Sequence, residues 1–512
     1  MSKKVVFTYA FQNKKAGNAD GKIIFDGGFS GDATVSLCWA RRDGDSYACL
    51  PDYTPLISTS ADILARGVMI DKSLLIPEGA IALLANCDGE EYAFDIPAEK
   101  LATATEKPLY TVAFGGDLHL GGWGSEKCAK EGLVKAREEI NNLADAFVTA
   151  GDLVQWHGAY SEYEFKKYNW DGARFADNGE KSEEYFGQGL SQWQVAEDYL
   201  DGFRVPVYHC QGNHDIRDTE VWSSVYGETD HFGAFLEKWI EKSENNKKYE
   251  NKIDRDKSVH YYDAEIFGDR FIFTEAPRPT LPHDRFGDDQ LYWLDRCLFD
   301  GERSGKPIFV LGHCPLTNDL NDANRCLPFE DIDRMLEILK KHPTAIYISG
   351  HSHYTLDSLH KNAVNGGQEK PSFFHVGGMA ITVRMENGKK VSLGSTQTVI
   401  CEVYRDRAVL RGRDHSLGKW VSLGRAELGF KKPCLAGMIS IERDQSTSAA
   451  SFFAHAENTH GVRFEWYLDG KLAGEGERFT APDSFDGYIA LRAIDADGGF
   501  CSVVDDVVEP KK

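Results

Sequence analysis

The sequence has no long hydrophobic run. Across its 512 residues, no window comes near the roughly 18 apolar residues that a membrane-spanning helix needs. The first residues also lack the apolar segment and small-residue cleavage site of a signal peptide, and residues 1–12 are predicted to form a strand instead. We therefore expect a cytoplasmic protein that makes no use of a membrane.

Cysteine is present, but not in any pattern that carries chemistry. The eleven cysteines are odd in number, scattered, and never in C-x-x-C spacing. That excludes a recognisable cysteine-ligated metal site and argues against a disulfide framework. Several cysteines, such as Cys38, Cys87 and Cys401, lie inside apolar runs. We expect reduced, buried thiols.

Positive charge is scarce. Lysine and arginine number 58 against 80 aspartates and glutamates, which gives a net charge of -22 at pH 7. A surface this acidic disfavours non-specific binding of nucleic acid or anionic membranes, and the lack of a basic stripe disfavours a nuclease. We expect neither nucleic acid nor membrane partners, and the oligomeric state stays open.

The length of the chain requires several domains, because one compact core does not accommodate so many residues. Residues 1–107 contain alternating or short apolar stretches, separated by Asp-Gly pairs that are typical of β-hairpins. They predict a small antiparallel β-domain. Residues 433–512 again alternate, as in Phe464–Leu472 and Gly487–Ile494, and resemble an immunoglobulin-like β-domain.

Between these β-domains, residues 108–424 predict a layered α/β domain. Apolar residues 110–114, an amphipathic helix over 126–143 and a second apolar run over 146–150 make a strand-helix-strand unit, which implies parallel strands. Apolar runs at 205–208, 307–311 and 345–348 continue that sheet. Those at 372–376, 398–404 and 408–411 predict a second sheet packed on the first. The predicted fold class is α/β, a layered two-sheet core with small β-domains on both sides.

Short polar motifs follow the apolar runs of this middle domain. They are Asp117-Leu118-His119, Gly151-Asp152, Gly212-Asn213-His214-Asp215, Gly312-His313 and Gly350-His351-Ser352-His353. Singly, each fits an ordinary turn. Together they place carboxylate, amide and imidazole groups at the carboxyl ends of strands, where open α/β sheets have their sites. These are the ligands that divalent cations take in the absence of cysteine.

The ordered set of motifs resembles the calcineurin-like metallophosphoesterase superfamily. The resemblance implies two divalent metal ions, Mn, Fe or Zn, joined by one carboxylate, that of Asp152. The two remaining ligand sets that it implies are Asp117, His119 and His353 for one metal, and Asn213, His313 and His351 for the other. The implied reaction is hydrolysis of a phosphate ester by a hydroxide that bridges the metals.

The resemblance gives His214 a catalytic role beside the metals. It would face the substrate and protonate the leaving oxygen or stabilise charge on the phosphoryl group. Asp215 would orient that imidazole or cap the following helix, and we favour the cap. The sequence after Asp152 lacks the tyrosine of purple acid phosphatases and the Asp-Arg-Gly of calcineurin-type protein phosphatases. The pattern looks closer to class III cyclic-nucleotide phosphodiesterases and glycerophosphodiesterases.

An aromatic-rich insertion follows Asp152, from Trp156 to about Gly189. It would either form a rim over the site, with His157 nearest the metals, or pack on its own domain. The expected substrate is a small-molecule phosphate ester, with a slight preference for organic phosphodiesters. The alternatives are a phosphomonoesterase and a glycan- or protein-binding protein in which the metal core is secondary.

Overall fold

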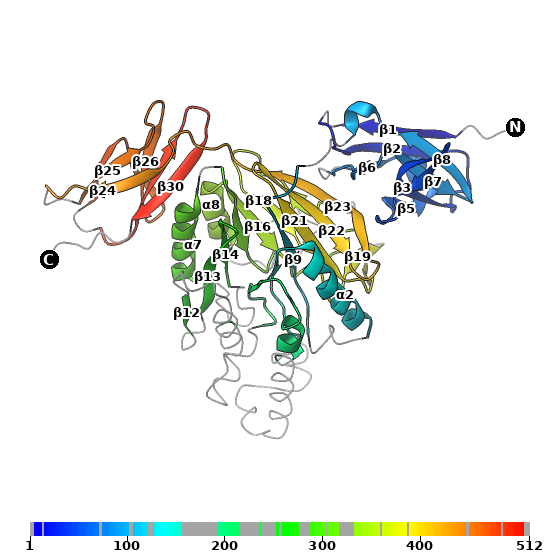
Figure 1. Ribbon diagram of the computed structural model, residues 1–512, viewed down its shortest axis with the longest axis horizontal. Coiled ribbons are helices and arrows are strands. Elements are labelled where there is room, and N and C mark those ends of the chain that lie inside the picture. The colour runs from blue at the N-terminus through cyan, green and yellow to red at the C-terminus, as the bar shows by residue number, and fades with distance from the viewer. Residues whose placement is uncertain are drawn as a thin grey trace, which may run out of the picture.

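The computed structural model has β-rich regions at both ends of a mixed α/β middle (Figure 1). It describes residues 5–12, 15–70, 74–101, 106–120, 127–155, 193, 195–215, 236, 252–254, 259–275, 287–303, 305–316, 332–358, 361–386, 389–446, 450–482 and 485–505. Among these residues, no helix has the length and apolar character needed to cross a membrane. The mixed α/β class with β-rich flanks is confirmed.

The N-terminal β-region consists of antiparallel strands in two sheets, as its alternating sequence predicts. One sheet has the order β1 (Val6–Phe11), β2 (Gly21–Asp26), β6 (Val68–Ile70). The other has the order β4 (Ser46–Cys49), β3 (Thr34–Asp43), β7 (Ala82–Cys87), β8 (Glu90–Asp95), with β5 (Ile57–Ser60) also on β3. Two short helices, α1 (Ala61–Arg66) and η1 (Ala98–Lys100), complete the region. Phe25, Leu37 and Trp39 are buried in its core.

One cysteine pair corrects the expectation of reduced thiols. Cys38 on β3 and Cys49 on β4 form a disulfide, with their Cα atoms 5.8 Å apart. The antiparallel register places Cys49 opposite Ala40, two residues from Cys38. The two cysteines are 11 positions apart in the sequence, so only the hairpin brings them together. The free cysteines within the described residues are buried, as expected.

The middle of the chain contains two large sheets. The first has the order β11 (Val207–His209), β10 (Ala146–Thr149), β9 (Tyr110–Gly115), β21 (Gln397–Val403), β22 (Arg407–Asp414), β23 (Lys419–Gly429). The second has the order β12 (Lys252–Asp254), β13 (Val259–Ile266), β14 (Asp269–Phe273), β15 (Ile308–Leu311), β16 (Ala345–Ser349), β18 (Ser372–His375), β17 (Ala363–Val364). The middle part also contains helices α2 (Lys127–Leu143), α7 (Asp288–Gly301) and α8 (Ile332–Lys341), and a hairpin of β19 (Val383–Glu386) and β20 (Lys389–Ser392). Residues 195–200 are helical as well.

The assignment of strands to these sheets differs from the prediction. The unit β9–α2–β10 is present with parallel strands, as expected. However, β15 and β16 lie in the other sheet, together with β18. Strands β21 and β22 extend the sheet of β9, because β21 pairs antiparallel with β9 along its free side. Continuous apolar strands do not reveal which neighbours they choose.

Aromatic side chains from the two sheets meet in one buried cluster. The ring of Phe114 on β9 lies 6.4 Å from that of Phe271, 6.0 Å from that of Phe309 and 5.4 Å from that of Phe374. All four side chains are almost fully buried. The apolar sequence of these strands therefore serves a core shared by strands that lie far apart in the chain.

The C-terminal β-region also has two antiparallel sheets. Their orders are β24 (Ile439–Arg443), β25 (Ser451–Ala456), β28 (Arg478–Thr480), and β27 (Lys471–Glu475), β26 (Arg463–Leu468), β29 (Ile489–Ile494), β30 (Phe500–Asp505). Trp466 is buried between them. The predicted β-rich character is confirmed, whereas the boundaries of all three predicted domains stay predictions.

Each flanking β-region contacts the middle of the chain. In the N-terminal region, Thr54 N donates to the carbonyl of Trp420 at 2.9 Å, and Trp420 N donates to the carbonyl of Asp52 at 2.8 Å. This short pairing lies on β23, the edge strand of its sheet. In the C-terminal region, the guanidinium of Arg492 donates to the buried Glu302 at 2.7 Å, and His342 Nδ1 lies 2.8 Å from the same carboxylate.

The buried ion pair predicts a large stability effect. Arg492→Met removes one partner of Glu302, a carboxylate that is 0% exposed, and should lower the free energy of unfolding by about 3–5 kcal/mol. Arg478→Met is the matched control in the same region, because Arg478 pairs with Asp444 while more than half exposed. Arg478→Met should lower the free energy of unfolding by less than about 1 kcal/mol. Urea unfolding measures both, and equal losses would contradict the prediction.

Candidate metal centre

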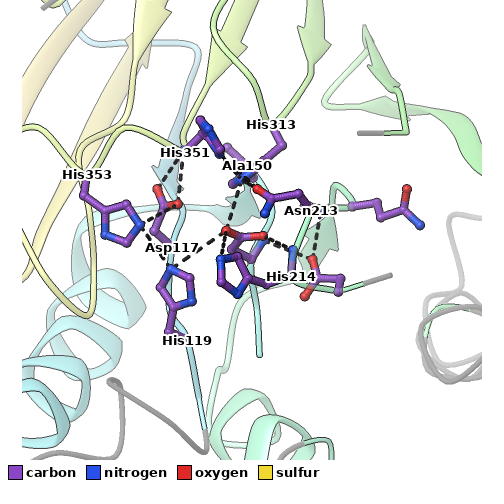
Figure 2. Close-up of polar contacts among 12 residues, drawn as sticks. Asp117, His119, Ala150, Asn213, His214, His313, His351 and His353 are labelled. Carbon is purple, nitrogen blue, oxygen red and sulfur yellow. Dashed lines mark hydrogen bonds and ion pairs between the residues drawn. The ribbon is translucent and has the colours of Figure 1, made fainter. Parts of the chain in front are cut away.

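The predicted ligands follow the carboxyl ends of strands, as expected. Asp117 comes two residues after β9 and Asp152 three residues after β10, and Asn213 follows β11. His313 and His351 come two residues after β15 and β16 of the other sheet. The structure brings all seven predicted ligands and His214 into one cluster (Figure 2).

Asp117, His119 and His353 form the first group that could hold a cation. His353 Nε2 lies 3.4 Å from Asp117 Oδ1 and 3.1 Å from His119 Nε2. The other ring nitrogen of His353, Nδ1, lies 3.1 Å from the carbonyl of Ile381 and donates to it. A neutral His353 therefore points its Nε2 lone pair at a carboxylate oxygen, an arrangement that a cation between them would stabilise.

Asn213, His313 and His351 form the second group. His313 Nδ1 lies 2.7 Å from the carbonyl of Ala150 and donates to it, so in the neutral ring Nε2 carries the lone pair. That Nε2 lies 3.0 Å from Asn213 Oδ1 and 3.2 Å from His351 Nδ1. His351 Nδ1 is also 2.9 Å from the same amide oxygen. An amide oxygen and two imidazole nitrogens thus converge on one point, a set of ligand atoms that suits a divalent cation.

The carboxylate of Asp152 lies between the two groups. Its Oδ2 is 3.1 Å from His313 Nε2 in the second group and 3.8 Å from His119 Nε2 in the first. Its Oδ1 accepts a hydrogen bond from the backbone N of His214 at 2.8 Å. One oxygen is thereby fixed by the backbone, and the other faces both sets of ligands.

The electrostatics favour the ligand forms of His119, His351 and Asp152. Burial lowers the pKa of His119 well below its ordinary value and that of His351 to about 3, so both imidazoles are neutral. Burial opposes ionisation of Asp152, but attraction by His313 and His214 outweighs it and holds the pKa of that carboxyl well below its usual range. Burial also opposes charge on His313, yet Asp152 raises its pKa to about 9. A bound cation therefore competes with a proton at this nitrogen.

The backbone of the cluster is unusual. Eight described residues other than glycine have a positive φ, and five of them are predicted ligands. The five are Asp117 (57°), His119 (44°), Asp152 (55°), His351 (69°) and His353 (60°). The other three each precede a glycine in a hairpin turn. Left-handed backbone is costly for these residue types, and such strain concentrates at functional sites.

His214 lies at the same cluster but in a different setting. Its Nε2 is 3.8 Å from Asp152 Oδ2, and its Nδ1 is 3.3 Å from the carbonyl of Gln155. The side chain is 12% exposed, whereas that of His313 is 0% exposed. A neutral His214 that donates through Nδ1 therefore presents Nε2 toward the cluster from a position that solvent reaches.

Sequence reasoning missed the groups that support the ligands. The carbonyls of Ala150 and Ile381 orient two imidazoles, and no side chain marks them in the sequence. His375, interpreted as structural, lies 3.1 Å from the hydroxyl of Ser352, between His351 and His353 in the chain. The predicted aromatic rim from Trp156 to Gly189, with His157, lies outside the described residues.

Imidazoles, carboxylates and an amide that cluster at the strand ends of a mixed α/β domain are the arrangement in which metal-dependent enzymes bind their cations. Residues 110–355 match the family model of the calcineurin-like phosphoesterases. The middle of the chain thus contains a calcineurin-like phosphoesterase domain, and this family implies hydrolysis of phosphoesters in general. No curated protein matches the chain significantly.

Proposed function

We propose that the middle domain hydrolyses phosphate esters with two divalent cations. Asp117, His119 and His353 would hold one cation, Asn213, His313 and His351 the other, and Asp152 would contact both. The position of Asp152 Oδ2 between the two groups carries this proposal. The tautomers that Ala150 and Ile381 impose supply lone pairs where they are needed.

The bound cations would supply positive charge for the phosphate group and acidify a water molecule. The chain itself holds the bridging carboxylate in place through the backbone N of His214. The His214 side chain would act on the substrate: Gln155 fixes its Nδ1, and a protonated Nε2 would donate to the oxygen of the departing alcohol.

The proposed substrate is a small-molecule phosphate ester, preferably an organic diester. The net charge of -22 leaves the cations as the main attraction for an anion. The preference for a diester rests on the aromatic residues that follow Asp152 in the sequence. Mn, Fe and Zn all suit nitrogen and oxygen ligands. The proposed architecture is a layered two-sheet domain over 108–424, with β-domains over 1–107 and 433–512.

Two nitrophenyl esters test the function. Purified protein of measured metal content should hydrolyse nitrophenyl phosphate or bis(nitrophenyl) phosphate. We expect a higher rate on the second of these, which is the diester. Chelation should abolish this turnover, and Mn²⁺ should restore it. Absence of turnover on both esters, at two bound metals per chain, would favour the alternative of a binding protein.

A further inference from the structure

We propose that Asp215 is a positioning residue whose side-chain hydrogen bonds hold two ligand-bearing loops together. We call these hydrogen bonds the tie. The loops are residues 150–155, which carry Asp152, and residues 211–214, which carry Asn213 and His214. The proposal rests on the proposed metal centre, although Asp215 is not one of its ligands. Neither of the roles considered from the sequence, a helix cap or a partner of the His214 ring, describes these contacts.

The contacts of Asp215 all go to backbone N–H groups. Its Oδ1 accepts from Leu153 N at 2.9 Å and from Val154 N at 3.3 Å. Its Oδ2 accepts from Asp152 N at 3.0 Å and from Gly212 N at 2.7 Å. The residue is only 5% exposed. One buried side chain thus accepts hydrogen bonds from four backbone N–H groups of two loops.

The two loops touch so closely that only glycine fits between them. A Cβ atom at Gly212 would lie 2.1 Å from Asp152 N. At Gly151, where φ is +94°, it would lie 2.6 Å from His313 Nδ1 and 2.7 Å from the Cα of Gly212. The glycines therefore permit the contact, but they cannot hold it. Asp215 supplies the attraction that does.

Further hydrogen bonds connect the two tied loops to the proposed ligands. The backbone carbonyl of Asp152 accepts from Leu118 N at 2.9 Å and from His119 N at 3.1 Å, so the tied loop also positions the Asp117 loop. The carboxylate of Asp152 is held by His214 N, which lies one residue from Asp215. Displacement of this tie would alter the distance between the two groups of ligands.

Asp215→Asn tests the role because it removes only half of the tie. One oxygen remains, but an NH₂ group then faces two N–H donors. Asp495→Asn is the matched control. Asp495 is 6% exposed and accepts from the backbone N of Leu435, Asp497 and Gly499 at 2.7–2.9 Å. It holds a loop of the C-terminal β-region in the same chemical manner.

The readouts are Mn²⁺ affinity by calorimetry and the electron paramagnetic resonance spectrum of the Mn²⁺-loaded protein. Both substitutions should lower the melting temperature. Only Asp215→Asn should weaken Mn²⁺ binding, by about 10–100-fold, the range for groups that orient metal ligands. It should also change the spectral coupling between the two Mn²⁺ ions. Unchanged affinity and coupling in Asp215→Asn would overturn the proposal, as would an equal loss of affinity in Asp495→Asn.

Two further outcomes, a variant that does not fold and a protein without ester turnover, have different consequences for the proposal. If Asp215→Asn does not fold, Asp215→Glu retains the charge and is tested in the same way, with displaced loops and weakened Mn²⁺ coupling as the expected result. If neither wild type nor variant hydrolyses an ester, but Mn²⁺ affinity and coupling still respond to Asp215, the proposed function fails while the positioning role stands. Failure of the positioning role alone leaves wild-type turnover intact.

Discussion

Asp152→Asn should strip the centre of metal and abolish phosphoester turnover. The Oδ2 atom of Asp152 lies between both groups of ligands, and an amide carries no charge with which to hold two dications. The loss of metal affinity should exceed the ~10–100-fold typical of a group that only orients a ligand. Metal analysis after gel filtration and turnover of a nitrophenyl ester measure the two effects.

Asp414→Asn is a suitable control for this substitution. Asp414 is also a buried aspartate of the middle domain, at 4% exposure, but its carboxylate accepts from Leu417 N and Gln397 Nε2, away from the cluster. The Asp414→Asn variant should keep its bound metal. Retention of both metals and near wild-type turnover by Asp152→Asn would show that Asp152 does not bridge.

His214→Ala should separate metal binding from catalysis. If Nε2 of His214 protonates the leaving oxygen, the variant keeps its metals and loses roughly 10²–10⁴-fold in rate on esters of poorly acidic alcohols. The loss should be much smaller on nitrophenyl esters, whose leaving oxygen barely needs a proton. Steady-state rates on a series of leaving groups provide the measurement.

Other outcomes of the His214 experiment have distinct meanings. An equal loss on all esters would assign His214 to binding or stabilising the phosphoryl group. A loss of metal would make it a ligand, which its distance of 3.8 Å from Asp152 Oδ2 keeps open. His455→Ala, an exposed histidine paired with Glu442 in the C-terminal β-region, should leave every rate unchanged.

The candidate site could be predicted because its chemistry depends on side chains, whose types and positions the sequence states directly. Asp117, Asp152 and His313 each follow an apolar strand within three residues, so a one-dimensional pattern places them at one edge of the sheets. The groups that orient these ligands could not be predicted. It comes from backbone atoms such as the carbonyl of Ala150, and every residue type supplies a carbonyl.

The fold was predictable in class but not in pairing. The strand-helix-strand unit of β9, α2 and β10 follows from local periodicity, which short-range contacts fix. The pairing of β9 with β21 joins residues about 290 positions apart and depends on which apolar edges meet. Helix α7 was also missed, although Leu291, Leu294 and Leu298 have helical spacing and are buried.

The docking of residues 52–54 on β23 covers part of a sheet edge that could otherwise pair with another chain. An edge strand offers a row of unsatisfied backbone groups to any passing chain, and natural sheets cover, charge or bend such edges. Here the N-terminal β-region covers the start of β23 by pairing with Trp420. Shortened chains that begin at the middle domain would expose this edge, and aggregation would be the first consequence to look for.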